Sequence, residues 1–103
     1  MKASPQMSFF EVTDKAMKHF GSNAQVDKLI EEVGELQKAL IKYKECGVIA
    51  SSHVAEEMAD VNMVMVPLQR ALNLQKMVED WTNVKLIRLN DIVNKSRKIE
   101  GYE

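Results

Sequence analysis

Helix-breaking residues are scarce in this chain, and their positions divide it into four segments that are each long enough for a helix. Proline occurs only at positions 5 and 67, and glycine only at positions 21, 34, 47 and 101. No segment alternates apolar and polar residues over a length that would indicate a β-strand. We therefore expect an all-α fold of four helices, which run from about Ser8 to Phe20, from Ser22 or Asn23 to about Glu45, from Ser51 or Ser52 to about Leu72, and from about Gln75 to Lys95.

The predicted helix ends carry residues that favour them. Ser8 can cap the first helix through its hydroxyl group, and Gly21 can end that helix. Ser51 or Ser52 is expected to cap the third helix. Asn73 indicates a tight turn before the fourth helix, since asparagine tolerates turn conformations that most residues avoid.

The second and third predicted helices carry long apolar stripes. The stripe consists of Val26, Leu29, Ile30, Val33, Leu36 and Leu40 on the second helix, and of Val54, Met58, Val61, Met65, Leu68 and Leu72 on the third. The third helix is also apolar on its opposite face, at Ala59, Met63 and Val66. Residues 1–103 fit a single domain, and a chain of this length builds only a small core. We therefore expect a four-helix module whose bundle is completed by dimerisation or tetramerisation, with the third helix at the subunit interface.

Two acidic motifs with the same spacing lie in these two helices. They are Glu31-Glu32-x-x-Glu35 and Glu56-Glu57-x-x-Asp60. Carboxylates three residues apart are neighbours on one helix face, so two crossing helices can hold four of them together. The helical positions favour Glu32, Glu35, Glu57 and Asp60 as the inward residues, and they place Glu31 and Glu56 toward solvent. Clustered carboxylates repel one another unless a cation neutralises them, and all-oxygen ligands suit Mg²⁺ or, alternatively, Mn²⁺.

The fourth predicted helix places two cations within an apolar face. Lys85 and Arg88 share this face with Met77, Trp81, Val84 and Ile92. Cations in such surroundings are unusual unless they extend to solvent or meet an anion, and a phosphate chain held by metal ions would be such an anion. The alternative is that both cations pair with Asp80 or Asp91 at the surface.

Composition excludes several classes of protein. The net charge of −1 provides no basic field that would attract nucleic acid or an anionic membrane surface. The single cysteine, Cys46, excludes an intramolecular disulfide. No apolar run is long enough to span a membrane, and no signal-peptide pattern is visible, so we expect a cytoplasmic protein. The chain also lacks the phosphate-binding GxxxxGK[ST] loop and the Glu-x-x-His pairs of di-iron bundles.

The two acidic motifs and their separation resemble those of the MazG-like nucleotide pyrophosphohydrolases, which belong to the all-α NTP pyrophosphatase superfamily. The matching stretches are residues 24–36 and 53–66, and residues 85–89 are similar to the basic last helix of that family. The resemblance implies Mg²⁺-dependent hydrolysis of a nucleoside triphosphate between its α and β phosphates, which gives a monophosphate and pyrophosphate. It also implies a house-cleaning role in the nucleotide pool and a homodimer or homotetramer.

The resemblance further implies a role for each matching residue. The metal ligands would be Glu32, Glu35, Glu57 and Asp60; the catalytic group would be Glu31, Glu32 and Glu35; and the substrate would be bound by Gln25, Lys28, Lys85 and Arg88. In that arrangement Glu31 would orient or deprotonate the attacking water. The first predicted helix offers no base-reading motif, so base and sugar specificity stay open.

Two other functions fit the same residues. A non-enzymatic helical adaptor would use the acidic motifs as solvated faces and the apolar third helix as its binding surface. A degenerate relative of the family would bind a nucleotide without turnover. Pyrophosphate release from a panel of nucleotides, with and without Mg²⁺, distinguishes the three.

Overall fold

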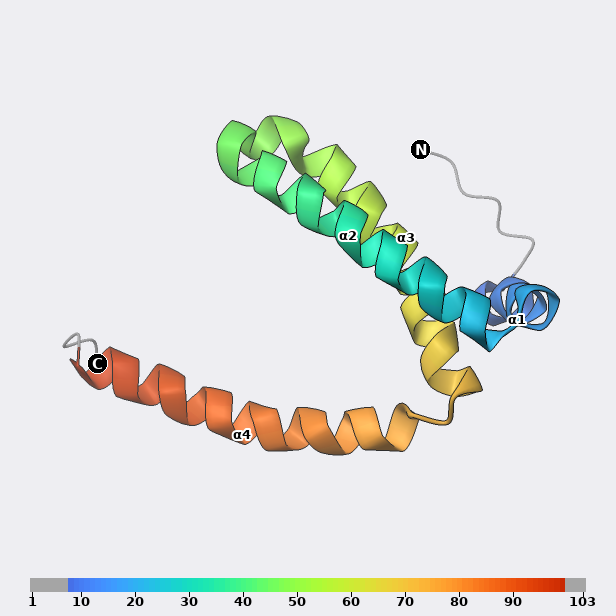
Figure 1. Cartoon of the computed structure of the whole chain (residues 1–103). Helices are drawn as coiled ribbons and strands as arrows, with labels where there is room; N and C mark the ends of the chain where they lie inside the picture. Colours follow the sequence, from blue (N-terminus) through green and yellow to red (C-terminus); the bar gives the residue numbers. More distant parts are fainter. Residues whose placement is uncertain (1–7, 100–103) are drawn as a thin grey trace. The chain divides into compact units, whose positions relative to one another are not determined.

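The described part of the chain is entirely helical, which confirms the predicted all-α class. A computed structural model describes the backbone of residues 8–99 and the side chains of residues 8–96. The helices are α1 (Phe9–Phe20), α2 (Ser22–Cys46), the short 3₁₀ helix η1 (Gly47–Ala50), α3 (Ser51–Ala71) and α4 (Gln75–Ile99), as Figure 1 shows. Internal contacts divide the chain into two compact units, Met1–Leu72 and Asn73–Glu103. The first unit contains α1, α2, η1 and α3, and the second contains α4.

Both ends of α1 form as the sequence predicts. The Oγ of Ser8 accepts a hydrogen bond from the backbone N–H of Glu11 at 3.1 Å. Gly21 has a φ of +86° and donates its backbone N–H to the carbonyl oxygen of Met17 at 2.9 Å. A left-handed φ of this kind costs residues with a side chain more than glycine, so Gly21 permits the reversal between α1 and α2. The predicted turn at Asn73 is confirmed by its φ of +56°.

The predicted serine cap of α3 is wrong. The preceding chain is already helical in η1, and the N-cap position is taken by Ala50 without a side-chain hydrogen bond. Ser51 has helical angles of φ −60° and ψ −41°, whereas a capping serine needs an extended backbone. The predicted end of α4 near Lys95 is also wrong, because α4 continues to Ile99.

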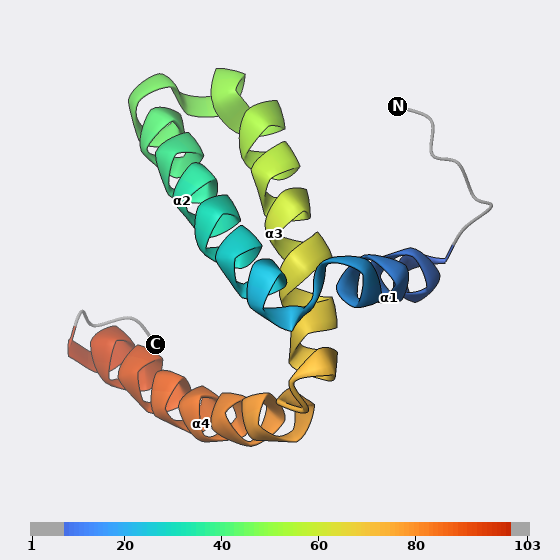
Figure 2. The same cartoon turned by 45° about the vertical axis from the view of Figure 1, so that its right-hand side comes forward.

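The core of the first unit lies between α2 and α3, which run antiparallel side by side in Figures 1 and 2 and are joined by η1. Helix α1 packs against both. The buried apolar residues are Ala39, Val54, Val61, Val64 and Leu68. No side chain among residues 8–96 is completely buried. The core is therefore small, as expected for a chain of this length.

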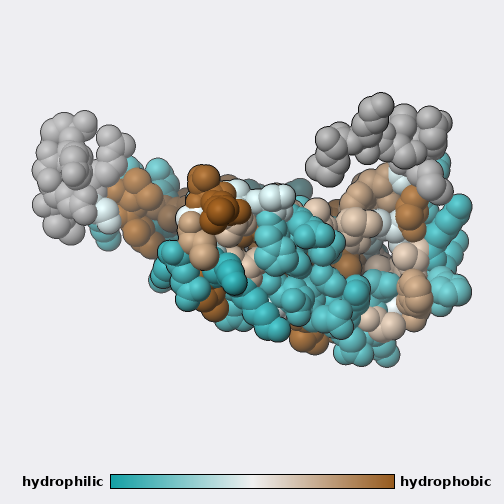
Figure 3. All heavy atoms as spheres, turned by 90° about the horizontal axis from the view of Figure 1, so that it is seen from above, coloured by the Kyte–Doolittle hydropathy of each residue, from teal (hydrophilic) through white to brown (hydrophobic). Residues whose placement is uncertain are grey.

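The faces that meet in this core are rotated from the predicted apolar stripes toward the acidic residues. On α2 the two buried residues are Glu32 and Ala39, whereas Ile30 and Val33 from the predicted stripe are 66% and 48% exposed. On α3, Val64 is buried although it lies outside the predicted stripe. The stripe residues Met58, Met65 and Leu72 are exposed instead. This rotation brings the carboxylates into the helix interface and leaves apolar side chains uncovered. Exposed apolar residues form separate brown patches on the largely hydrophilic face seen in Figure 3.

Candidate metal site and adjoining pocket

Three carboxylates meet where α2 packs against α3. Glu32, Glu57 and Asp60 each offer an oxygen atom, and these atoms all lie within 4.8 Å of one another. Glu32 and Glu57 are only 8% and 9% exposed, and Asp60 is half-buried. Glu57 and Asp60 are neighbours on α3 because they are three residues apart, while Glu32 reaches them from α2. The structure therefore brings together three of the four inward carboxylates predicted from the sequence.

The charges in this cluster oppose one another. Burial raises the pKa of Glu57 above its ordinary value of 4.5, and the negative charges of Asp60 and Glu32 raise it further, although His53 acts in the opposite direction. Both causes disfavour the ionised form of the Glu57 carboxyl group. A bound cation would reverse this effect, because it favours the charged form of every carboxylate around it.

Lys28 supplies positive charge to the cluster. Its Nζ lies 3.1 Å from Oε1 of Glu32 and 3.3 Å from Oε1 of Glu31. The hydrogen bonds to these two carboxylates raise the pKa of Lys28, the one to Glu32 having the larger effect. The ammonium group of Lys28 thus neutralises part of the charge that a metal ion would otherwise balance.

Glu35 is not brought into the cluster. Its side chain is 50% exposed and pairs with the Nζ of Lys38 at 3.6 Å. The spacing alone does not decide this, since Glu57 and Asp60 have the same spacing and both belong to the cluster. Glu35 instead lies on an exposed side of α2. Glu31 and Glu56 are both exposed, as the helical positions predict.

A second group of possible ligands adjoins the first. His53, Glu56 and Glu57 also offer atoms within 4.8 Å of one another, and Glu57 belongs to both groups. The distance from Nε2 of His53 to Oε1 of Glu57 is 3.9 Å, and that from Nδ1 to Oε1 of Glu56 is 3.5 Å. The sequence analysis assigned no role to His53. The spacing His-x-x-Glu-Glu on one helix was the signal that could have indicated these contacts.

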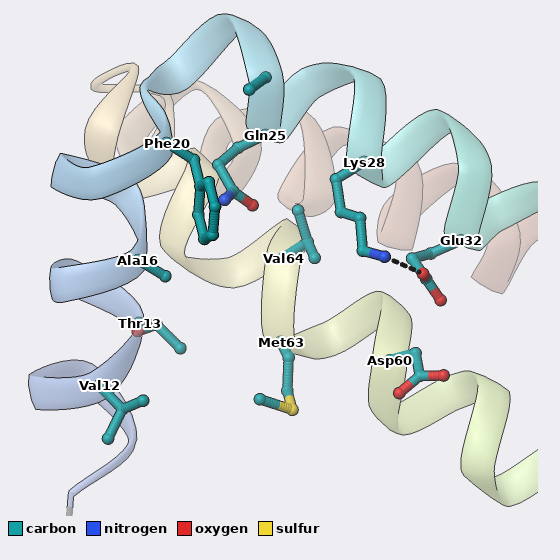
Figure 4. Close-up of a pocket in the computed structure, with 11 residues that line it drawn as sticks. Val12, Thr13, Ala16, Phe20, Gln25, Lys28, Glu32, Asp60, Met63 and Val64 are labelled. Carbon is teal, nitrogen blue, oxygen red and sulfur yellow. Dashed lines mark ion pairs between the residues drawn. The ribbon is translucent and has the colours of Figure 1, made fainter.

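A pocket of about 560 Å³ opens beside the carboxylates, between α1, α2 and α3. Figure 4 shows Lys28 and Glu32 descending from α2, Asp60 and Met63 on α3, and side chains of α1 along the facing wall. The lining residues are Val12, Thr13, Ala16, Phe20, Ala24, Gln25, Lys28, Glu32, Asp60, Met63 and Val64. Gln25 and Lys28, which were predicted to face a substrate, thus line the same pocket as two of the carboxylates.

The sequence interpretation missed the contribution of α1. Val12, Ala16 and Phe20 repeat every four residues, which places them on one face of that helix. This short stripe was the available signal, but nothing in the spacing indicated that the stripe would face the acidic residues rather than a core.

Lys85 and Arg88 lie in α4, which forms the second unit, and both side chains are exposed. The Nζ of Lys85 lies 5.9 Å from the centroid of the Trp81 ring, within the range of a cation–π contact. Asp80 is engaged by Lys76 at 2.7 Å. Within residues 8–96, neither Lys85 nor Arg88 forms an ion pair with Asp80 or Asp91, which was the alternative considered from the sequence.

Comparison of the chain with protein-family models, with curated proteins and with solved structures found no match. The resemblance to the MazG-like enzymes therefore rests on the sequence motifs alone. None of the described helices is long and apolar enough to cross a membrane.

Proposed function

We propose that this protein is a Mg²⁺-dependent nucleoside triphosphate pyrophosphohydrolase, which converts a nucleoside triphosphate and water into the monophosphate and pyrophosphate. The observation that carries the proposal is the convergence of Glu32, Glu57 and Asp60 from two helices. Two of these carboxylates, Glu32 and Asp60, also line a pocket. A solvated acidic surface would have kept these side chains apart and exposed. Their burial instead costs free energy that a bound cation offsets.

The donor set fits a hard divalent cation. Mg²⁺ prefers oxygen ligands. The three carboxylate oxygens lie within 4.8 Å of one another, and rotation of their side chains would bring them closer around one ion. We keep Glu35 as the predicted fourth ligand, and its binding requires that the ion pair with Lys38 opens. Mn²⁺ has the same ligand preference and is the alternative ion.

When bound, the ion would polarise the phosphate oxygens and lower the pKa of a coordinated water. In the proposed hydrolysis a water oxygen would attack the α-phosphorus, the bond from that phosphorus to the α–β bridging oxygen would break, and pyrophosphate would leave with the electron pair. Glu31 is the candidate acceptor for the proton of the water. Lys28 lines the pocket and offers its ammonium group to the phosphate chain. Lys85 and Arg88 are proposed to stabilise the charge that develops on pyrophosphate.

The protein is also proposed to act as a homodimer or homotetramer in nucleotide-pool house-cleaning. The support for self-association is the uncovered apolar surface of α2 and α3 together with the small core. This surface also suits the rival function, a non-enzymatic adaptor, but an adaptor gives no reason for buried carboxylates that line a pocket.

The test is pyrophosphate release from a panel of ribo- and deoxyribonucleoside triphosphates, with Mg²⁺ and with EDTA. We expect turnover of at least one nucleotide only with the metal. Glu57→Gln should lower kcat/KM on the order of a hundredfold, the size of effect seen when one preorganised electrostatic group is removed. Glu56→Gln is the matched control, since Glu56 is adjacent but exposed, and it should retain most of the activity. No release from any nucleotide would overturn the proposal, as would equal losses in the two variants.

A further inference from the structure

The pocket beside the carboxylates has two chemically different ends. Glu32, Asp60 and Lys28 form its charged end. The rest of its wall is mainly apolar and comes from all three helices, namely from Val12, Ala16, Phe20, Ala24, Met63 and Val64. Its volume of about 560 Å³ lies within the range of small-molecule sites, which are mostly apolar with a few placed polar groups. A metal-bound phosphate chain accounts for the charged end only.

The apolar end is suited to a flat ring. Figure 4 shows the ring of Phe20 projecting from the end of α1 next to Gln25, with Met63 and Val64 on α3. The side chain of Phe20 is 61% exposed, and the perpendicular ring of His19 lies beside it with 4.7 Å between the ring centroids. Stacking on an aromatic side chain suits every base, because each base has a π-face.

Two polar side chains lie among these apolar groups, and they differ in availability. The Oγ1 of Thr13 donates its hydrogen to the backbone carbonyl of Phe9 at 2.9 Å. The side-chain amide of Gln25 forms no hydrogen bond to any residue from 8 to 96, and it can both donate and accept. Gln25 is therefore the group in this wall that can distinguish one ring edge from another.

We propose that the apolar end of the pocket binds the base of the nucleotide, with Phe20 stacking on the ring and Gln25 reading its edge. The proposal rests on the proposed function, because the charged end is taken to hold the phosphates. It assigns stacking on the base to Phe20 at the end of α1 and recognition of the base edge to Gln25 in α2. It also makes Gln25 a specificity-determining residue rather than a general contact.

The stacking role is tested by binding rather than by turnover. NMR titration in Mg²⁺ compares the four nucleoside monophosphates with ribose 5-phosphate, which carries the sugar and phosphate without a base. The wild-type protein should bind the best monophosphate about tenfold more tightly than ribose 5-phosphate, or more, since stacking of one base contributes roughly 1–3 kcal/mol. Phe20→Ala and the pocket-filling Ala16→Trp should remove this difference. Phe9→Ala, at an exposed ring of the same helix outside the pocket, should keep it.

The outcomes separate the two proposals. If ribose 5-phosphate binds as tightly as every monophosphate while Mg²⁺-dependent hydrolysis is intact, the base assignment alone is overturned. It is also overturned if Phe20→Ala folds by circular dichroism and keeps the full difference. If neither type of compound binds and no nucleotide is hydrolysed, the proposed function and the base assignment fall together.

The role of Gln25 is tested by the ratio of kcat/KM for CTP to that for UTP. The two bases differ at C4, where cytosine presents a donor amine and uracil an acceptor carbonyl. Gln25→Glu removes the donor of this side chain and leaves only acceptors, which match the amine of cytosine. The ratio should therefore shift toward CTP by roughly tenfold, which is the effect of one hydrogen bond to a charged group. Thr13→Val, which removes a hydroxyl already bonded within α1, should leave the ratio unchanged. An unchanged ratio in Gln25→Glu would refute the specificity role.

Discussion

Lys28 and a bound metal ion compete for the same carboxylate. The Nζ of Lys28 lies 3.1 Å from Glu32, which is one of the three clustered carboxylates, so a divalent cation at the cluster must displace or repel this ammonium group. Lys28→Met should therefore bind Mn²⁺ more tightly, but only a few-fold, because an ion pair with a half-exposed partner is weak. The same variant should lose turnover if Lys28 contacts phosphates.

Metal affinity is measured by electron paramagnetic resonance of free Mn²⁺. Lys76→Met is the matched control, since it removes an equal charge from an exposed pair with Asp80 in α4. Affinity that is unchanged or weaker in Lys28→Met, relative to this control, would show that Lys28 does not compete with the ion.

Glu57 should make the stability of the metal-free protein depend on pH. Its pKa is raised in the folded state, mainly by burial, so ionisation of Glu57 disfavours folding. Stability in EDTA should therefore fall as the pH rises from about 4.5 through the raised pKa. Glu57→Gln should flatten this fall and melt at a higher temperature than the wild type at pH 7.

Thermal melts between pH 4 and 8 test this expectation. With added Mg²⁺ the wild type should melt at a higher temperature than Glu57→Gln, since the ion stabilises only a protein that binds it. Glu56→Gln changes the same charge at an exposed site and should follow the wild type in both conditions. A lower melting temperature for Glu57→Gln in EDTA at pH 7 would mean that Glu57 contributes to stability instead of costing it.

At the scale of helices, local sequence was enough to predict which elements form but not which faces they bury. Ser8, Gly21 and Asn73 each satisfy a local backbone requirement, and all three act as predicted. The buried face of α2 could not be read from its own residues, because the apolar stripe and the acidic flank lie side by side on it. In the packing against α3, Glu32 is buried and Val33 is left exposed. Glu35 is also left exposed and lies outside the cluster.

Two glycines in neighbouring elements should respond to alanine with opposite signs. Gly21 has a φ of +86°, which is unfavourable for alanine, so Gly21→Ala should destabilise the fold by about 1 kcal/mol or more. Gly34 lies inside α2 and has nothing within 4 Å of an added Cβ, so Gly34→Ala should stabilise it by about 0.5–1 kcal/mol. Urea unfolding at one protein concentration measures the free energy of unfolding of both variants. If both substitutions change this free energy in the same direction, the backbone conformation described for one of the two glycines is wrong.

At the scale of the molecule, the first unit has one face that its own helices do not cover. On α2 and α3, Val33 and Met58 each follow a buried glutamate by one residue, a rotation of about 100°. Because the two helices are antiparallel, this rotation carries both residues to the same side of the helix pair, away from the pocket. This apolar face comprises Ile30, Val33, Leu40, Met58, Met65 and Leu72, and all six side chains are exposed.

The proposed homodimer would use this apolar face in both subunits. Two antiparallel helix pairs joined face to face would give a closed four-helix bundle, in which the same patch serves both subunits. The pockets would stay on the outer sides of such a bundle. The sequence-based expectation placed the third helix at the interface, and this arrangement adds α2 to it. Homodimerisation should therefore depend on both helices.

Val33→Lys should convert the dimer to a monomer, because a charged side chain would be buried without a partner at the centre of the apolar face. The monomer should also melt at a lower temperature, since the small core of the first unit then stands alone. Val48→Lys is the control: Val48 is also an exposed valine, but it lies in η1 and outside the apolar face. Sedimentation equilibrium at micromolar concentration gives the mass of each variant. A wild-type protein that sediments as a stable, folded monomer would exclude the dimer, and equal effects of the two substitutions would place the interface elsewhere.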